Sequence, residues 1–359
     1  MTAIPQLLRR LDKYIEQAFE YGMRWDGQSV RVDDGALPGL ERGTFVRSVR
    51  MPQFDGITFH EVLCKSALNK VPQGGAGLPF QYTVNGYRGC SHACRYCFAR
   101  PTHEYLEFNC GKDFDTQVVV KTNVVDVLRR ELSRRSWCHE TVALGTNTDP
   151  YQRAEGRYVL MPGIIGALAE SGTPFSILTK GTLLRRDLPL IADAAENVPI
   201  GVSVSLAVGD ADLHKQVEPG TPSPQARLGL ITAIREAGLD CHVMVAPVLP
   251  YLTDTVEHLD ALLREIAAAG ANGVTVFGLH LRGSTRGWFI SWLSQTHPEL
   301  VGPYRQLYRR GAYLPPAYRD QLRARAAPLI ARYGLAGDQR RQDARRPQDV
   351  AETVQPTLF

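Results

Sequence analysis

The sequence of 359 residues lacks any apolar run close to the roughly 18 residues that a membrane-spanning helix needs. Its first residues also lack the apolar stretch of a secretory signal. Their charged residues recur on alternate turns in the manner of an amphipathic helix. We therefore expect a cytoplasmic protein with no membrane span.

Cysteine is scarce, and the number of cysteines is odd. The chain holds seven, spread between positions 64 and 241, which argues against a disulfide framework in a reducing compartment. Three of them, Cys90, Cys94 and Cys97, nevertheless fall within eight residues. That clustering predicts a chemical role for these three thiols.

Lysine is absent from Arg282 onward, although the net charge of the whole chain is +4. This C-terminal part carries thirteen arginines and six acids, a net charge of +7, which leaves −3 for the rest of the chain. A basic region of this kind favours a polyanionic partner such as nucleic acid. A solvated helical surface followed by a basic tail has the same composition.

Residues 1–79 show no regular alternation, and we expect a first helix followed by an irregular N-terminal extension. From about residue 80, short β-prone runs alternate with segments of helical periodicity. The expected strands are Gln81–Val84, Thr141–Leu144, Phe175–Leu178, Ile200–Ser205, Asp240–Val245 and Gly273–Gly278. The expected helices are Asn123–Arg135, Met161–Ser171, Leu184–Ala195, Ser223–Ala237 and Thr253–Ala269, with Asn123, Ser223 and Thr253 as N-caps and Gly172, Gly238 and Gly270 as C-caps.

This alternation predicts an α/β fold with a parallel sheet. Six strand–helix units are too few to close an eight-stranded barrel, so we expect an open, partial (β/α)6 TIM-type barrel over residues 80–282. A C-terminal helical region at 283–336 and a disordered basic tail at 337–359 complete the expected domains. In such folds the chemistry gathers at the carboxyl ends of the strands.

The three clustered cysteines lie in NGYRGCSHACRYCFAR, directly after the first expected strand, with the spacing C-x₃-C-x₂-C. A zinc site normally needs four protein ligands, and His92, between the first two cysteines, is not spaced as a fourth. A cubane iron–sulfur cluster takes one ligand per iron, so three thiolates leave one iron open. The open iron can bind a small chelating molecule.

This spacing, with Tyr96 before the last cysteine, resembles the signature of the radical S-adenosylmethionine (SAM) superfamily. The resemblance implies a [4Fe–4S] cluster on Cys90, Cys94 and Cys97. The amino and carboxylate groups of SAM would bind the open iron, and a flavodoxin or ferredoxin would donate the electron that generates a 5′-deoxyadenosyl radical. It places Tyr96 near the adenine, although an aromatic at this position also suits simple loop packing.

Further cofactor-binding residues are implied at the ends of later strands. The resemblance places the SAM amino group at the loop Thr146, Asn147, Thr148 and Asp149, whose other interpretation is an Asx-type turn before Pro150. A strand-end Lys180 can pair with the SAM carboxylate or be an ordinary surface lysine.

Hydroxyl and charged side chains complete the predicted SAM site. Ser203 and Ser205 share one face of the fourth strand and suit the ribose or methionine of SAM. Glu218 and Arg227 can form an ion pair that orients SAM or a purely structural salt bridge. His280 ends the sixth strand, where it can face the substrate or be structural. No catalytic residue is assigned.

Within the superfamily, the cysteine stretch, GTNTDPYQ and ILTKG together resemble the spore photoproduct lyase-like, or DNA repair photolyase-like, branch. Lys180 matches the lysine with which the lyase contacts SAM. Two hydrogen-relay residues of the lyase do not match: Thr146 stands where it has cysteine, and Phe98 where it has tyrosine. Cys110, Cys138 or Cys241 could replace the lost hydrogen donor, although each also reads as a small buried hydrophobe.

The resemblance therefore predicts a radical SAM enzyme that acts on a nucleic acid, in repair or modification, without repairing spore photoproduct. Two alternatives remain open. One is a radical SAM enzyme that modifies a peptide, a protein or a small molecule. The other is a non-catalytic metal- or nucleic-acid-binding protein that keeps the cysteines for structure.

The last five residues, Gln355–Phe359 (QPTLF), resemble the short motif by which bacterial repair and replication proteins bind the sliding clamp. Leu358 and Phe359 have no local core to join and suit a pocket on a partner, with Gln355 at its rim. Pro356 replaces the usual leucine. The alternatives are a tail that folds back onto the barrel or one without a partner.

Overall fold

The computed structural model of the chain describes residues 31–33, 45–71 and 79–337. The expected N-terminal helix, all but the first residue of the expected tail, and the clamp-like motif Gln355–Phe359 lie outside the described residues. Among those described, no helix is both long and apolar enough to cross a membrane. All seven cysteines are described, and none forms a disulfide.

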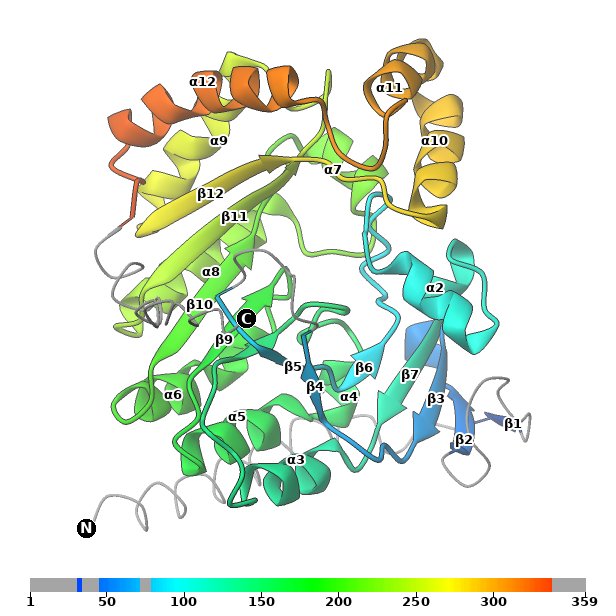
Figure 1. The fold of residues 1–359 in the computed structure, drawn as a ribbon, viewed down its shortest axis with the longest axis vertical. Helices are drawn as coiled ribbons and strands as arrows, with labels where there is room; N and C mark the ends of the chain where they lie inside the picture. Colours follow the sequence, from blue (N-terminus) through cyan, green and yellow to red (C-terminus); the bar gives the residue numbers. More distant parts are fainter. Residues whose placement is uncertain (1–30, 34–44, 72–78, 338–359) are drawn as a thin grey trace, which may run out of the picture.

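A seven-stranded sheet forms the main body of the fold (Figure 1). Six of its strands run parallel, in the order in which they follow one another along the chain, and an antiparallel strand β4 is added at one edge. The strands are β4 (Leu68–Lys70), β5 (Tyr82–Val84), β8 (Val142–Leu144), β9 (Phe175–Thr179), β10 (Ile200–Ser205), β11 (Cys241–Val248) and β12 (Gly273–Gly278). The six expected strands and the open, partial barrel are confirmed.

Helices cover the outer face of this sheet in chain order, each in contact with the next. They are α3 (Val124–Leu132), α5 (Met161–Glu170), α6 (Leu184–Ala195), α8 (Pro224–Glu236), α9 (Val256–Ala268) and α12 (Pro316–Arg332). Apolar side chains such as Ile177, Val204 and Val243 point outward into this helical layer and are fully buried. Alternation turns Leu178, Ser205 and Met244 to the inner face, which the site uses.

Glycine follows three of these helices in the left-handed conformation, as expected: φ is +69° at Gly172, +77° at Gly238 and +88° at Gly270. Ser223 caps α8 by accepting a hydrogen bond from the Ala226 amide. The prediction for α9 was wrong, because Thr255 is its N-cap. Thr253 instead accepts a hydrogen bond from the Leu249 amide.

A second, five-stranded sheet corrects the expectation of an irregular N-terminal extension. Three of its strands, β1 (Arg31–Asp33), β2 (Phe45–Arg50) and β3 (Thr58–Val62), come from residues 1–79. The parallel neighbour of β3 is β7 (Gln117–Lys121), about sixty positions away in the sequence. This long-range pairing supplies the order that the local sequence does not show.

The C-terminal helices lie beside the carboxyl ends of the barrel strands (Figure 1). Helices α10 (Ser284–Thr296) and α11 (Val301–Leu307), with the 3-10 turn η3 (Pro298–Leu300), place Phe289, Trp292 and Tyr304 in a core shared with Cys94 and Tyr96. The remaining short elements are η1 (Pro52–Phe54), β6 (Tyr87–Arg88), η2 (Arg100–Leu106), α2 (Lys112–Thr116), α4 (Glu155–Tyr158) and α7 (Ala211–Val217).

Candidate active site

The three clustered cysteines lie in a loop that follows β5 and β6 and open onto one cavity. Cys90 and Cys94 are buried and Cys97 is half-buried. Gly89 precedes them with φ +79°, and a Cβ there would lie 2.8 Å from the ring of His103. Only glycine therefore suits the turn that brings the loop to the cavity.

Two side chains that the sequence interpretation missed hold this loop. The buried guanidinium of Arg100 donates to the Cys94 carbonyl at 2.8 and 3.1 Å, to the Gly111 carbonyl at 2.7 Å and to Asp115 at 2.8 Å. The side chain of Gln152 accepts from the Ser91 amide at 3.0 Å and donates to the Gly89 carbonyl at 3.0 Å. The loop is thus fixed from both sides by buried polar groups.

The donor set at the cavity consists of three sulfur atoms, which suits an iron–sulfur cluster. Burial raises the pKa of Cys97 to about 11 and that of Cys94 well above its usual value, so both thiols stay protonated at neutral pH unless a metal replaces the proton. Within the described part of the chain, no three His, Cys, Asp or Glu side chains are placed to hold a single metal ion. A cubane needs no such convergence, because each thiolate binds a different iron.

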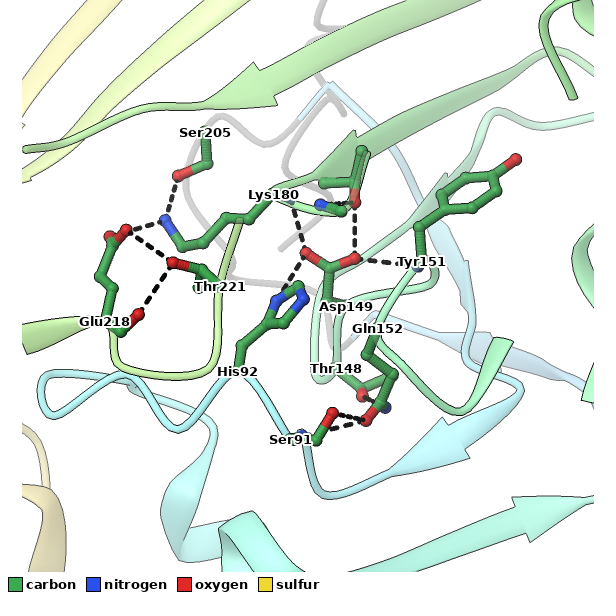
Figure 2. A network of polar contacts seen from close by, with 12 residues as sticks. Ser91, His92, Thr148, Asp149, Tyr151, Gln152, Lys180, Ser205, Glu218 and Thr221 are labelled. Atoms are coloured by element: carbon green, nitrogen blue, oxygen red, sulfur yellow. Dashed lines mark hydrogen bonds and ion pairs between the residues drawn. The ribbon is translucent and has the colours of Figure 1, made fainter. Parts of the chain in front are cut away.

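Lys180 follows β9 and enters the cavity at the centre of a buried charge network (Figure 2). Its Nζ donates to Ser205 Oγ at 2.5 Å and lies 3.2 Å from Glu218 Oε1. Glu218 also binds Arg227 Nη2 at 2.6 Å and accepts a hydrogen bond from the Tyr96 hydroxyl. The predicted pair Glu218–Arg227 is therefore present and is joined to Lys180, Ser205 and Tyr96.

The carboxylate of Glu218 is completely buried and stays ionised. Burial alone would raise its pKa, but the charges of Arg227 and Lys180 outweigh burial and hold the pKa well below its usual range. The buried Glu218 anion thus faces the buried Arg227 and the partly buried Lys180, so these three groups together carry a net positive charge beside the cavity. A ligand carboxylate would be attracted to this charge in the low-dielectric interior.

Asp149 ties the loop after β8 to the start of the loop after β9 (Figure 2). Its carboxylate accepts hydrogen bonds from the Thr179 hydroxyl at 2.5 Å, the Lys180 amide at 2.7 Å and the Tyr151 amide at 2.9 Å, and it lies 3.3 Å from His92 Nδ1. Both oxygens are therefore engaged by the protein. These contacts favour a positioning role for Asp149 over direct contact with a ligand.

The rest of this loop is tied to the strand that leads into the cysteine loop. The Thr148 hydroxyl donates to the Gly89 carbonyl at 2.6 Å. Asn85, which the sequence interpretation passed over, accepts from the Asn147 amide at 3.2 Å and donates to Thr146 Oγ1 at 3.4 Å. Strand β8 therefore presents its loop against the cysteines in a fixed register.

Most of the predicted site residues line this one cavity. Ser203, Glu218 and Arg227 are not among the lining residues, although Glu218 and Arg227 reach the cavity through their contacts with Lys180 and Ser205. The predicted residues at the cavity wall are Cys90, Cys94, Tyr96, Cys97, Thr146, Asn147, Thr148, Asp149, Lys180, Ser205 and His280.

The opposite wall of the cavity is apolar. It is formed by Met244, Ala246 and Pro247 from β11 and by Phe277 and Leu279 at the end of β12. The three candidate replacement donors, Cys110, Cys138 and Cys241, are not among its lining residues. The cavity thus joins a thiol-rich, charged side to an apolar side where a substrate can be held away from water.

The chain was compared with protein-family models and with known proteins. The family model of the radical SAM superfamily matches residues 84–278. An uncharacterized protein of Mycobacterium tuberculosis (strain H37Rv) is 75% identical over 342 residues, which cover 94% of this chain and 100% of the relative. An uncharacterized protein of Methanocaldococcus jannaschii is 28% identical over 239 residues, 67% of this chain and 83% of the relative.

Solved structures with a similar fold include spore photoproduct lyases. One variant of that enzyme aligns with a TM-score of 0.57 and 16% identity, over 78% of this chain and 81% of the lyase. Another, with bound AdoMet and dinucleoside spore photoproduct, aligns with a TM-score of 0.56 and 15% identity, over 77% and 79%. At these identities the likeness shows a shared fold.

Proposed function

Because the chain belongs to the radical SAM superfamily, whose members use a [4Fe–4S] cluster and SAM, we propose that Cys90, Cys94 and Cys97 hold that cluster. The observation that carries the proposal is the convergence of these three thiols and the charge network of Lys180 on one cavity. Once both are bound, an electron from an external donor would allow SAM cleavage to a 5′-deoxyadenosyl radical, which is the hydrogen-abstracting chemistry these cofactors would supply.

The chain's own residues bind and orient SAM in this proposal. The ammonium of Lys180 receives the SAM carboxylate, drawn by the net positive charge of the buried group Lys180, Glu218 and Arg227. Tyr96, fixed by its hydrogen bond to Glu218, supplies an aromatic wall for the adenine. Ser205 is placed beside Lys180 to bind a polar group of SAM, while Ser203 stays a prediction.

The loop after β8 receives the SAM amino group. Thr146, Asn147 and Thr148 line the cavity and offer short polar groups there, while Asp149 holds the loop in position. The apolar wall formed with β11 and β12 keeps water from the reacting atoms.

We further propose that the substrate is a nucleic acid, modified or repaired by a reaction other than the repair of spore photoproduct. Residues 282–336 contain nine arginines and two acids, so the whole basic excess of the C-terminal part lies in the segment that forms α10, α11, α12 and their connections, and α10 and α11 adjoin the cavity end of the barrel. Phosphate groups are the ligands that such a surface attracts. The fold shared with spore photoproduct lyase supports the same substrate class.

Formation of 5′-deoxyadenosine by the anaerobically reconstituted protein tests this function. With SAM and a reductant we expect slow formation of 5′-deoxyadenosine, accelerated by single- or double-stranded DNA or RNA. Acceleration by peptides or small metabolites alone would assign the enzyme to another substrate. A protein that holds a full cluster and SAM yet forms no 5′-deoxyadenosine with any of these would be a non-catalytic binding protein.

A separate proposal concerns the C-terminal motif Gln355–Phe359, which suits the peptide-binding pocket of a bacterial sliding clamp. Support comes only from the sequence QPTLF, since the motif lies outside the described residues. Titration of a peptide covering residues 346–359 against purified clamp measures the interaction. The proposal requires binding that is lost when Leu358 and Phe359 are replaced by alanine.

A further inference from the structure

A row of aromatic rings runs outward from the cavity along the end of β12. Phe277 and His280 line the cavity and stack at 5.3 Å with an interplanar angle of 20°. His280 meets Tyr313 edge-on at 5.1 Å, and the guanidinium of Arg282 lies 5.0 Å from the centre of the Tyr313 ring. Phe277 and Tyr313 are 37% and 49% exposed. Exposed aromatic rings grouped at a cavity mouth mark a binding surface.

The row is built on a rigid base. The Leu281 amide donates to the Ala312 carbonyl at 2.9 Å, and the buried Tyr308 hydroxyl donates to the Leu279 carbonyl at 2.8 Å. Gly278 packs so closely on Leu314 that a Cβ there would lie 2.3 Å from Leu314 Cδ1. The loop that carries Tyr313 is therefore fixed to the end of β12, and its ring is preorganised for a ligand.

Positive charge accompanies the exposed rings. Arg282, which lies over Tyr313, is exposed and has no ion-pair partner among the residues that the structure describes. A ligand that satisfies both features needs flat rings and negative charge. Nucleic acid has both, and only unpaired bases offer a free ring face, because duplex bases are stacked on each other.

We propose that Phe277, His280, Tyr313 and Arg282 form a stacking row that holds an unpaired nucleotide of the substrate at the mouth of the cavity. A base stacks on the exposed rings, and Arg282 contacts the adjoining phosphate. Phe98, in the cysteine loop, lines the same cavity and is 58% exposed, so it offers a further ring for a neighbouring base. This inference rests on the proposed function, because it identifies how the proposed substrate is held.

Fluorescence anisotropy with labelled single-stranded DNA and RNA tests the row on the cluster-loaded protein without SAM or reductant. Tyr313→Ala should weaken binding about fivefold to a hundredfold, the range for loss of one base–aromatic contact. Tyr313→Phe should restore it. Arg282→Ala should weaken binding and lower the slope of log affinity against log salt by about one. The fluorescence of an oligonucleotide that contains 2-aminopurine should be quenched when the wild type binds it, and should not be quenched by Tyr313→Ala.

Tyr105→Ala is the matched control, because Tyr105 is 78% exposed and is not among the residues lining the cavity. It should bind like the wild type. If the wild type bound oligonucleotides and Tyr313→Ala matched Tyr105→Ala, the stacking row would be overturned while the proposed substrate class stood. If the wild type bound neither DNA nor RNA at low salt, the proposed substrate class would fall as well. Tighter, Tyr313-dependent binding of an acidic peptide would assign the row to a peptide.

Discussion

At the scale of single residues, Lys180 has the most closely defined surroundings in the site. Its ammonium contacts Ser205 at the cavity wall and Glu218 behind it, and lies 5.7 Å from the centre of the Tyr96 ring. The backbone amide of Lys180 also donates a hydrogen bond to the Asp149 carboxylate. A single strand end therefore connects the loop after β8 with the buried charge network.

Replacing Lys180 by alanine should weaken SAM binding and leave the iron content unchanged. A lost charge-assisted contact is worth about 1.5–3 kcal/mol, or roughly ten- to a hundredfold in affinity. Equilibrium dialysis with labelled SAM measures the change. Lys215→Ala is the control, because Lys215 is 74% exposed on α7 and, among the described residues, forms an ion pair with the exposed Asp212 alone. Equal SAM affinities for the two variants would place Lys180 outside the SAM site.

Replacing any one of Cys90, Cys94 or Cys97 by alanine should remove the visible absorbance of the cluster and abolish formation of 5′-deoxyadenosine. The physical reason is that in the proposed cluster each thiolate would be the sole protein ligand of one iron. Cys138→Ala should behave like the wild type, because Cys138 is exposed and is not a lining residue of the cavity. A full cluster and normal SAM cleavage in a Cys90, Cys94 or Cys97 variant would refute the ligand assignment.

Some site residues could be predicted from the sequence and others could not, depending on whether a local sequence pattern marks their position. Lys180 and Asp149 follow strand ends, and strand ends are visible in the sequence. Arg100 and Gln152 act through backbone carbonyls and amides of the cysteine loop, which carry no sequence signal. Ser203 was predicted for a different reason. The alternation of residues along β10 shows that Ser203 and Ser205 share one face, but it does not show how far along the strand the cavity extends, and only Ser205 lines it.

At the scale of elements, the turn between α7 and α8 packs directly on the cysteine loop. A Cβ on Gly220 would lie 2.0 Å from the Ser91 carbonyl oxygen, and the Gly220 amide donates to the His92 carbonyl at 3.1 Å. The same turn carries Glu218, which binds Lys180. The cysteine loop and the turn that carries Glu218 are therefore in close contact at Gly220, a position that only glycine can occupy.

Gly220→Ala should displace Ser91 and His92, and with them the cysteines on either side. Overpacking of this kind costs about 1–3 kcal/mol of folding free energy. Thermal unfolding should show the loss of stability, and iron analysis should show incomplete cluster loading. Gly302→Ala is the matched control, because a Cβ on Gly302 in α11 meets nothing within 4 Å. The predicted packing would be wrong if Gly220→Ala and Gly302→Ala had equal stability and iron content.

The elements themselves were predictable where their pattern is local. All six parallel strands and their helices follow from short apolar runs, helical periodicity and glycine C-caps. The sheet of β1, β2, β3, β7 and β6 was not expected, because its central parallel pairing joins β3 to β7, about sixty positions further along the sequence. Strand β2 reads FVRSVR, with adjacent Ser48 and Val49 buried and Arg47 paired to Glu61 of β3, so its sequence shows no apolar alternation.

At the scale of the whole molecule, the fold unites a SAM-binding barrel with a basic C-terminal layer, while the hydrogen-relay residues of spore photoproduct lyase are replaced. Thr146 and Phe98 both line the cavity, at the positions where the resemblance places the relay cysteine and tyrosine. A threonine hydroxyl is a poor hydrogen-atom donor, and phenylalanine has no phenol. The proposed substrate radical must therefore be quenched in another way.

The protein should consequently fail to convert a dinucleotide spore photoproduct to thymines over multiple turnovers. Chromatography of the reaction products, with cluster, SAM and reductant present, measures this directly. Formation of 5′-deoxyadenosine serves as the internal control that the cofactors are functional. Clean, repeated conversion to thymines would show that the missing relay residues have been replaced within the fold.

The central claim is that SAM binds the iron that no cysteine holds. Electron paramagnetic resonance of the reduced, reconstituted protein tests it most directly, with SAM occupancy measured on the same sample. We predict the signal of a reduced [4Fe–4S] cluster whose line shape changes when SAM is added, and no such signal from Cys94→Ala. A cluster signal that stays unchanged while SAM is bound would contradict the claim.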